Sequence, residues 1–366
     1  MTMPRSPIGQ SVQELDTPAL LVDLNIMESN IARMAKTFRE AGVKWRPHIK
    51  GIKIPAIAHQ LLLAGAIGVT CAKLSEAEVM AAAGIRDILI ANQIVGPQKA
   101  ARLAALCRHA DPIVTVDSIE HVRELGAAAQ HIGVRLRAVI EVNCGLDRCG
   151  VEPGEAVVRL AKELSAHPGL RFAGLMTWEG HTLRTAPENR RKVVEESLSL
   201  LTSSADACRA NEIPVDIVNC GGTGDYWLSA HVKGVTEIEA GGGIFGDRFY
   251  QSKGVNHPIA LTVLSTVISR PTPTRIVTDS GRKAMMVEDH GEPWPKGIAA
   301  VTSVRISSEH GQCELEAASA VPRIGDKLEW LVAYGDMTLF LHDELFGIRD
   351  GVVETVWPIL GRGKIT

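Results

Sequence analysis

The sequence has 366 residues, of which 45% are apolar and 22% are charged, and its formal net charge is −3. This length suits more than one small domain, and the apolar share is enough for a large buried core. The balanced charge and the aromatic content of 4% argue against a nucleic-acid-binding protein. The apolar runs are too short to span a membrane, and the seven cysteines contain no Cys-x-x-Cys pair. We therefore expect a cytoplasmic protein with reduced thiols and without a signal peptide, a membrane partner or a nucleic-acid partner.

Strand-like and helix-like segments alternate along the first two thirds of the chain. Short apolar runs predict strands at residues 19–23, 43–46, 68–71, 87–91, 112–116, 136–142, 172–176, 215–219 and 237–240. Amphipathic or alanine-rich runs predict helices at residues 26–40, 52–63, 74–83, 97–108, 119–131, 154–165 and 188–211. Repeated strand–helix units with short connections predict a parallel sheet, and about eight such units predict a closed (β/α)8 TIM barrel.

The pattern changes near residue 250, after which helical runs give way to short β-rich pieces. These pieces lie at residues 261–270, 275–278, 297–307, 327–332, 337–341 and 344–349, and Gly, Pro and Asp residues separate them. They predict an antiparallel β domain. We expect the barrel to comprise residues 24–250, and the β domain to comprise residues 1–23 and 251–366.

A short basic segment, residues 45–50, ends one of the predicted barrel strands. Pro47 disfavours helical backbone in the residue before it, so Lys50 is expected just beyond the carboxyl end of the strand. In a β/α barrel, catalytic groups lie at that end. Three neighbouring side chains would lower the pKa of the lysine by charge repulsion: Arg46, His48 and Lys53. An amine with a lowered pKa can form a Schiff base with a carbonyl compound, whereas the alternative interpretation is a solvated basic strand end.

Two glycine-rich stretches follow the last two predicted barrel strands. The first contains Gly221, Gly222, Thr223 and Gly224, and the second is residues 240–243. Backbone N–H groups in such turns can converge on an anion, and barrel enzymes often bind a phosphate after their last strands. Ordinary tight turns are the alternative. Neither stretch matches the P-loop pattern, so a nucleoside triphosphate is not expected.

Five further side chains are candidates for chemistry. Arg148 follows the strand at residues 136–142, where it could donate to a ring nitrogen or a carboxylate, and His181 is a candidate acid or base after the next strand. Tyr334 and Asp336 would share one face of a strand, and Asp336 with His310 could bind a divalent metal. Arg148 has a plainer interpretation as a surface turn residue, and His181 has one as an idle loop residue. For His310 and Asp336, no third metal ligand is visible in the sequence.

Several stretches together resemble a known family, the D-threonine aldolase and D-serine dehydratase group of pyridoxal-phosphate enzymes with the alanine-racemase fold. The matching stretches cover nearly the whole chain, at residues 17–23, 46–50, 70–78, 87–92, 148–150, 221–224, 279–281 and 309–311. The resemblance implies a homodimer with pyridoxal 5′-phosphate near the domain interface. It implies that Lys50 is the Schiff-base lysine. It also implies a set of further cofactor-binding residues: Arg148, Gly221, Gly222, Thr223, Gly224, Tyr226, Gly241 and Gly242.

The chain departs from this family in its metal pair and in two smaller details. The family pairs a histidine with an aspartate or cysteine two residues later, whereas this chain has Tyr334 and Asp336. A phenol, with an ordinary pKa of about 10, is a poor metal ligand beside an imidazole. A divalent Mn, Mg or Zn ion at Asp336 and a proton-transfer role for Tyr334 therefore both stay open. In addition, Gly51 stands where the family has threonine, and residues 241–243 replace Gly-Ser-Tyr.

The resemblance implies a lyase acting on D-3-hydroxy amino acids, with Lys50, His181 and Tyr334 as candidate catalytic residues. Asp336, where dehydratases carry a cysteine, favours retro-aldol cleavage to glycine and an aldehyde. Three alternatives are elimination by a D-serine or 3-hydroxyaspartate dehydratase, racemisation by Lys50 and Tyr334, and a catalytically inactive relative retained for binding. A pyridoxal-phosphate homeostasis protein is an alternative outside enzymes, although such proteins lack a β domain.

Overall fold

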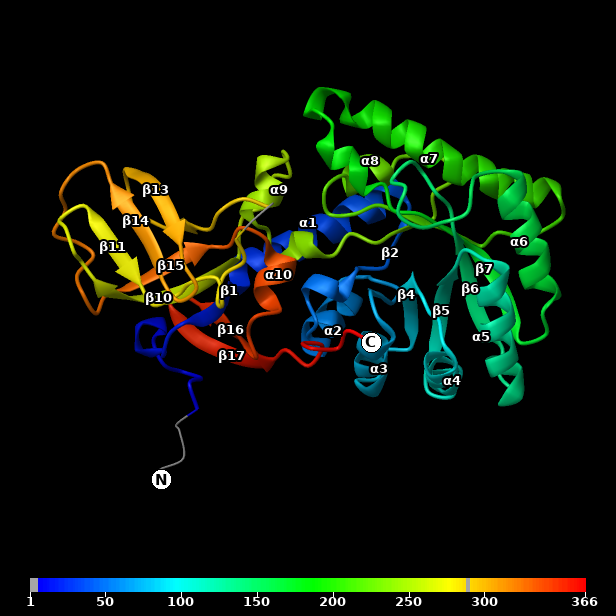
Figure 1. The fold of residues 1–366 in the computed structure, drawn as a ribbon, viewed down its shortest axis with the longest axis horizontal. Helices are drawn as coiled ribbons and strands as arrows, with labels where there is room; N and C mark the ends of the chain where they lie inside the picture. Colours follow the sequence, from blue (N-terminus) through cyan, green and yellow to red (C-terminus); the bar gives the residue numbers. More distant parts are fainter. Residues whose placement is uncertain (1–5, 288–289) are drawn as a thin grey trace. The chain divides into compact units, whose positions relative to one another are not determined.

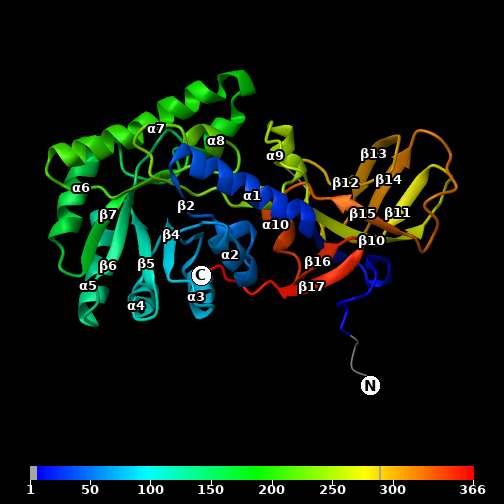
Figure 2. The same cartoon turned by 180° about the vertical axis from the view of Figure 1, so that it is seen from behind.

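The computed structural model describes residues 6–287 and 290–366. Figure 1 and Figure 2 show the chain from two opposite sides. It divides into two compact units: the chain up to Ala32 together with Gly242–Arg362, and Arg33–Gly241 together with Gly363–Thr366. The observed break after the last barrel strand falls at Gly241, ahead of the expected residue 250, and helix α1 (Leu24–Ala41) is divided between the units. None of the helices in the described part of the chain combines the length and apolarity that crossing a bilayer requires.

The second unit is a barrel of parallel strands. They are β2 (Lys44–Trp45), β3 (Val69–Cys71), β4 (Asp87–Gln93), β5 (Asp111–Val116), β6 (Leu136–Glu141), β7 (Leu170–Met176), β8 (Ile217–Cys220) and β9 (Glu237–Ile238). Their order is β2-β9-β8-β7-β6-β5-β4-β3. The end strands meet because Ile67 N donates to Trp45 O and Thr70 N donates to Pro47 O, each at 2.9 Å. The expected closed barrel is therefore confirmed.

Helices alternate with these strands and cover them on the outside. They are α2 (Pro55–Leu63), α3 (Leu74–Ala82), α4 (Pro97–Leu106), α5 (Ile119–His131), α6 (Glu155–Ala166), α7 (Pro187–Ala210) and the short α8 (Tyr226–Ser229). In Figure 1, α4, α5 and α6 lie beside β4 to β7. Three of the helices, α2, α4 and α7, begin at proline, whose missing N–H has no partner in a first turn anyway. Ser118 caps α5 by accepting a hydrogen bond from His121 N.

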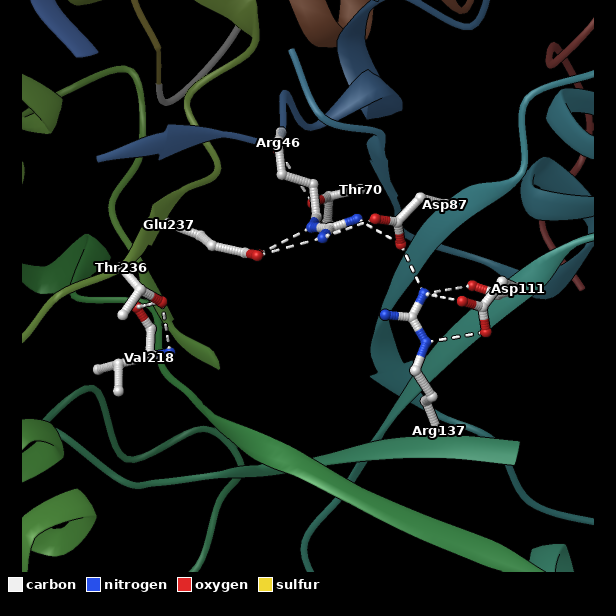
Figure 3. Close-up of polar contacts among 8 residues, drawn as sticks. All are labelled: Arg46, Thr70, Asp87, Asp111, Arg137, Val218, Thr236 and Glu237. Atoms are coloured by element: carbon white, nitrogen blue, oxygen red, sulfur yellow. Dashed lines mark hydrogen bonds and ion pairs between the residues drawn. The ribbon is translucent and has the colours of Figure 1, made fainter. Parts of the chain in front are cut away.

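The barrel interior combines an apolar cluster with a chain of ion pairs. The cluster consists of Leu89, Ile113, Val139, Ala173, Met176 and Ile217. The ion pairs join Arg46, Glu237, Asp87, Arg137 and Asp111 (Figure 3). The apolar cluster is a buried layer that fills the barrel in the way expected of this fold. The ion-pair chain runs from the buried Arg46 and Glu237 to the exposed Asp111.

The ion-pair chain lies where the strands begin. Asp87, Asp111 and Glu237 are the first residues of β4, β5 and β9. The Arg46 side chain is 1% exposed, and its Nε lies 2.9 Å from Glu237 Oε2. Its Nη1 lies 2.9 Å from Asp87 Oδ1, which also contacts Arg137 Nη2 at 2.7 Å. Arg46 therefore reaches toward the end of the barrel opposite to the one that Lys50 follows.

The first unit contains a mostly antiparallel sheet. Its strands are β1 (Ala19–Asp23), β10 (Leu261–Ser269), β11 (Arg275–Thr278), β12 (Trp294–Pro295), β13 (Val301–Ile306), β14 (Gly311–Leu315), β15 (Lys327–Leu331), β16 (Glu344–Arg349) and β17 (Val352–Pro358). The order is β13-β14-β11-β10-β1-β16-β17, and β15 pairs with both β10 and β12. Only the β1–β16 pair is parallel among the described strands of this sheet. Val12, Leu15, Leu21, Leu264 and Val353 belong to its core.

Short helices complete this unit, and one of them corrects a sequence-based expectation. They are η1 (Val12–Glu14), η4 (Gly242–Ile244), α9 (Arg248–Ser252) and α10 (Gly335–Leu339). The expected strand at residues 337–341 is wrong, because α10 occupies most of it. Thr338 N donates to Tyr334 O at 3.2 Å, which is a helical turn, and Gly335 N donates to Asp247 Oδ2 at 3.0 Å. These hydrogen bonds, one of them within the helix and one to a residue far away in the sequence, prevail over the strand preference of the apolar residues.

Candidate active site

Lys50 lies in a single turn of 3-10 helix, η2 (Ile49–Gly51), directly after β2. The turn begins at His48, whose Nδ1 accepts a hydrogen bond from Lys50 N at 3.3 Å. His48 N donates to Glu239 O at 2.7 Å, which attaches the turn to the segment after β9. Gly241 packs so closely on His48 O that a Cβ there would overlap the oxygen. The turn that carries Lys50 is thus built onto the second glycine stretch.

The structure gives a carboxylate partner or a neutral state to each of the three side chains expected to crowd Lys50: Arg46, Lys53 and His48. Arg46 is neutralised within the buried ion-pair chain. Lys53 forms a buried ion pair with Glu76, whose other oxygen accepts a hydrogen bond from Ala72 N at 2.7 Å. Burial, together with the charges of Lys50 and Lys53, lowers the pKa of His48 well below its ordinary value, so its imidazole is neutral. Carboxylate partners therefore offset the positive charges of Arg46 and Lys53, and the reactivity expected of the Lys50 amine stays a prediction.

Trp178 brings Lys50 and Arg148 together. Lys50 Nζ lies over the indole ring, 5.1 Å from its centroid, and Arg148 Cζ lies over it at 5.0 Å. Arg148 Nη2 is also 3.5 Å from Glu141 Oε1 at the end of β6. The distances from Lys50 Nζ and Arg148 Cζ to the ring centroid are both within the range of cation–π attraction. The half-buried Trp178 follows β7 and was missed in the sequence, although it lies between a predicted strand and His181.

The first glycine stretch adjoins the same indole. Gly221 adopts φ +83°, which side chains rarely tolerate, and a Cβ on Gly222 would come within 2.8 Å of Trp178 Nε1. A Cβ on Gly224 would overlap the side chain of Leu183. Thr223 is 5% exposed. The structure therefore places the stretch Gly221–Gly224 beside Lys50 and Arg148. A side chain at any of its three glycines would strain the backbone or overlap a neighbouring residue.

Two other predicted residues pack away from this group. His181 lies in η3 (Gly180–Arg184), and its Nε2 is 3.0 Å from Ser197 Oγ on α7. Burial lowers its pKa. Tyr226 is 4% exposed, packs on Phe38 with a ring distance of 5.3 Å, and hydrogen-bonds Thr37 of α1. The contacts of Tyr226 are those of a packing residue, and the roles proposed for both side chains stay predictions.

Tyr334, Asp336, His310 and Gly242 belong to the other compact unit. Tyr334 precedes α10, and its hydroxyl donates to Asp336 Oδ2 at 3.1 Å. The tyrosine ring stacks on His290, with centroids 4.3 Å apart and planes inclined by 8°. His310 is exposed in the turn between β13 and β14. The placement of these residues toward Lys50 stays a prediction.

The barrel residues fit pyridoxal 5′-phosphate. Besides the lysine, the guanidinium and the glycine stretch, two buried side chains lack partners for polar atoms within the described part of the chain: Asn219, at both Oδ1 and Nδ2, and Glu239, at Oε1. Asn219 stands two residues before the glycine stretch, and Glu239 is close enough for Lys50 to affect its pKa. Buried polar atoms normally have partners, so these atoms suit a polar ligand.

The residues around Asp336 do not fit a divalent metal in the same way. Among residues 6–287 and 290–366, no three His, Cys, Asp or Glu side chains are grouped to hold an ion. The Tyr334 phenol is protonated and uses Asp336 as its acceptor, because burial and the nearby carboxylate raise its pKa. A neutral phenol that donates to the carboxylate competes with a cation for that oxygen.

The barrel, its lysine-bearing turn and the first unit with its mostly antiparallel sheet define the class of alanine-racemase-fold proteins. Two family models match: "Alanine racemase, N-terminal domain" over residues 22–249 and "Putative serine dehydratase domain" over residues 260–348. The chain therefore belongs to the alanine racemase-like family, in the group that contains the D-threonine aldolases.

Individual relatives make this placement more specific. The chain is 36% identical to a D-threonine aldolase of Arthrobacter sp., covering 98% of this chain and 96% of the relative. It is 34% identical to a 3-hydroxy-D-aspartate aldolase of Paracoccus denitrificans, covering 97% and 94%. The crystal structure of D-threonine aldolase from Filomicrobium marinum matches with a TM-score of 0.95 at 34% identity, covering 99% of this chain and 100% of that one. D-threo-3-hydroxyaspartate dehydratase from Delftia sp. HT23 matches with a TM-score of 0.87 at 28% identity, covering 96% and 99%.

Proposed function

We propose that the protein is a pyridoxal-phosphate-dependent lyase that cleaves D-3-hydroxy amino acids to glycine and an aldehyde. The observation that carries this proposal is the group around Trp178. A lysine amine, a guanidinium and a glycine stretch adjoin one indole at the carboxyl ends of the barrel strands. The same chain is 36% identical to a D-threonine aldolase over nearly its full length.

Different barrel residues would contact different parts of the cofactor. Lys50 Nζ would hold its aldehyde carbon covalently, and Arg148 would donate to the ring nitrogen or to the substrate carboxylate. The turn formed by Gly221, Gly222, Thr223 and Gly224 would take its phosphate, with Gly241 and Gly242 from the second glycine stretch. Because the N–H groups of Gly221 and Gly222 already donate to carboxyl groups, those of Thr223 and Gly224 and the Thr223 hydroxyl would be the donors of this turn. When bound, pyridoxal 5′-phosphate supplies a ring that stabilises negative charge at the substrate's α carbon.

Two groups would move the protons of the reaction. Lys50 Nζ would deliver a proton to the α carbon once the Cα–Cβ bond has broken, which completes glycine. Tyr334 would accept the proton of the β-hydroxyl while passing its own proton to Asp336, to which it already donates at 3.1 Å. This relay needs no phenolate, in agreement with the raised pKa of Tyr334.

Elimination of water is the second candidate function. It is favoured by the serine dehydratase domain match over residues 260–348 and by the 33% identity to the Delftia dehydratase over 276 residues. Aldol cleavage ranks first because the aldolases match almost the entire chain at 34–36% identity, whereas this dehydratase matches 74% of it.

Product analysis separates these reactions. The purified protein, loaded with pyridoxal 5′-phosphate, is incubated with D-threonine, D-phenylserine, 3-hydroxy-D-aspartate and D-serine, with L-threonine as the control. We expect glycine and the matching aldehyde from a D-3-hydroxy substrate and none from L-threonine. An oxoacid with ammonia would identify a dehydratase, and an L-isomer would identify a racemase. If no substrate reacts, the proposal is wrong. We also propose a homodimer, for which light scattering should give twice the 39.3 kDa chain mass.

A further inference from the structure

The glycine stretch rests on two buried carboxyl groups that the proposed reaction does not use. Glu179 lies after β7 and is fully buried. Its Oε2 accepts a hydrogen bond from Gly221 N at 3.1 Å, and its Oε1 accepts one from Ser229 Oγ at 2.5 Å. Glu179 thus connects the first amide of the stretch to helix α8.

Asp225 accepts an equivalent pair of hydrogen bonds, one of them from the next amide of the stretch, that of Gly222. It is 3% exposed. Its Oδ1 accepts a hydrogen bond from Gly222 N at 3.3 Å, and its Oδ2 accepts one from Thr182 Oγ1 at 2.6 Å. Two successive amides of the expected phosphate-binding stretch, those of Gly221 and Gly222, therefore already donate to carboxyl groups and are not donors for a phosphate. Their hydrogen bonds fix the backbone of the stretch before any anion arrives.

The surroundings of this pair supply little positive charge. The positive charge of Arg190 on α7 lowers the pKa of Asp225, although burial outweighs this effect. Three further groups are close enough for the charge of Glu179 to affect their pKa: Glu239, which follows β9, and the thiols of Cys144 and Cys220. Burial raises the pKa of Cys144 and Cys220, so both thiols are neutral. Burial raises the pKa of Glu179, and burial together with Glu179 raises that of Asp225 well above its ordinary value. Ionising both of two buried carboxyl groups that repel each other is costly, so the pair keeps one proton, which we call the shared proton.

We propose that Glu179 and Asp225 are positioning residues that hold the Gly221–Gly224 stretch by its amides, and that they must keep a shared proton for the stretch to accept a dianionic phosphate. This inference rests on the proposed function, because the phosphate in question is that of the cofactor. Loss of the proton to solvent puts a second buried negative charge beside the phosphate and repels it. Phosphate-dependent affinity therefore falls as pH rises.

The test compares pyridoxal 5′-phosphate with pyridoxal, which has the same aldehyde and ring but no phosphate. The ratio of their dissociation constants for the apoprotein isolates the phosphate contribution, since the chemistry at Lys50 is common to both. Ratios are measured by absorbance titration between pH 6 and 9. For the wild type we expect the advantage of the phosphorylated compound to shrink by at least fivefold over this range.

The variants Asp225→Asn and Glu179→Gln keep an oxygen acceptor for the glycine amide but cannot ionise. We expect the ratio in each variant to change less than twofold with pH, and to exceed that of the wild type at pH 9. Asp216→Asn, an exposed residue just before β8, is the matched control and should follow the wild type. Asp225→Ala removes the acceptor and should lower the ratio at every pH, with thermal melting used to confirm folding.

The outcomes separate this inference from the proposed function. If both isosteric variants keep the pH slope of the wild type, the shared proton is not needed and the inference is wrong. If the wild-type ratio does not depend on pH, it is wrong as well. Protein that binds neither compound would overturn the proposed function and this inference together. Binding of both compounds with equal affinity would overturn only the phosphate role of the stretch and the inference drawn from it.

Discussion

Trp178 lies under the ammonium group of Lys50, whose Nζ stands 5.1 Å from the centroid of the indole ring. The same ring also carries Arg148, at 5.0 Å, and limits the space at Gly222. One side chain thus fixes the positions of two long, flexible cations next to the glycine stretch. Long side chains lose rotamer entropy when they are ordered, so an aromatic plane that orders them in advance lowers the cost of binding.

Replacing Trp178 tests this ordering role. In Trp178→Leu, Lys50 and Arg148 lose their common plane, and we expect the dissociation constant for pyridoxal 5′-phosphate to rise roughly 3- to 30-fold, matching about 0.5–2 kcal/mol of cation–π and ordering energy. Trp178→Phe keeps an aromatic face and should change it less. Trp357→Leu, on β17 of the other unit, serves as the control. Equal affinities in Trp178→Leu and the wild type would mean that the indole only fills space.

Lys50 is expected to bind the cofactor covalently. Lys50→Ala should abolish the absorbance band of the protein-bound cofactor, and borohydride treatment should no longer fix the cofactor to the chain. Lys44→Ala, at an exposed position on the short strand β2 that precedes Lys50, should retain both signals. A persistent band in Lys50→Ala, with the label mapped to another lysine, would reassign the cofactor-binding residue.

The buried ion pairs make Arg46 a stability residue. Arg46→Met leaves Glu237 buried and unpaired, which should lower the free energy of unfolding by about 3–5 kcal/mol. The double variant Arg46→Met/Glu237→Leu should recover part of this loss, because no carboxylate is then left without its partner. Arg159→Met removes an exposed pair with Glu155 and should cost less than about 1 kcal/mol. Urea denaturation measures all three, and similar losses for Arg46→Met and Arg159→Met would contradict the buried role.

Glu239 should make the stability of the apoprotein depend on pH. Burial raises its pKa to about 8, against about 4.3 for glutamate in an unfolded chain. Between these two values the folded protein binds a proton that the unfolded chain does not, so stability falls as pH rises through this window. Glu239→Gln cannot ionise. We expect it to raise the melting temperature relative to the wild type at pH 8 and to have little effect at pH 5.

The control for this pH dependence is Glu163→Gln, an exposed position on α6 that should follow the wild type at both values. An equal shift in melting temperature at pH 5 and pH 8 for Glu239→Gln would show that the carboxyl group of Glu239 is ionised throughout this range.

The Tyr334–Asp336 pair predicts activity that does not depend on a divalent metal. The phenol donates to Asp336, so chelator treatment should leave the wild-type activity unchanged, and Mn²⁺ should not shift its melting temperature. Tyr334→His should gain metal binding, seen as a Mn²⁺-dependent melting shift and as bound metal by elemental analysis, while Tyr334→Phe should not. Wild-type protein that carries one metal per chain, and loses it together with activity on chelation, would contradict this prediction.

The barrel was predictable because its signals are local and repeated. Strands such as β4 and β5 are short apolar runs between amphipathic helices, and their order follows from the parallel-barrel rule. The helix α10 was not predictable, because its start depends on the hydrogen bond from Gly335 N to Asp247 Oδ2, 88 residues away in the chain. The apolar stretch at residues 337–341 does not by itself contain that information.

The candidate site was predictable in part, for a similar reason. The positions of Lys50 and the glycine stretch after strands could be read from the sequence. The partners of Arg46 and Lys53 could not, since Glu237 and Glu76 reach them through the fold. Trp178, Glu179 and Asp225 carry no motif of their own, and their importance follows only from what they touch.

The strand β2 is only two residues long, yet the position of Lys50 along the barrel axis depends on it. Four residues before that lysine, Arg46 is clamped between Glu237 and Asp87 at the opposite end. Sliding the strand in either direction would pull the guanidinium out of this clamp. The ion pairs of Arg46 therefore fix the position of Lys50 along the barrel axis. Their loss would displace Lys50 Nζ even in a protein whose barrel still closes.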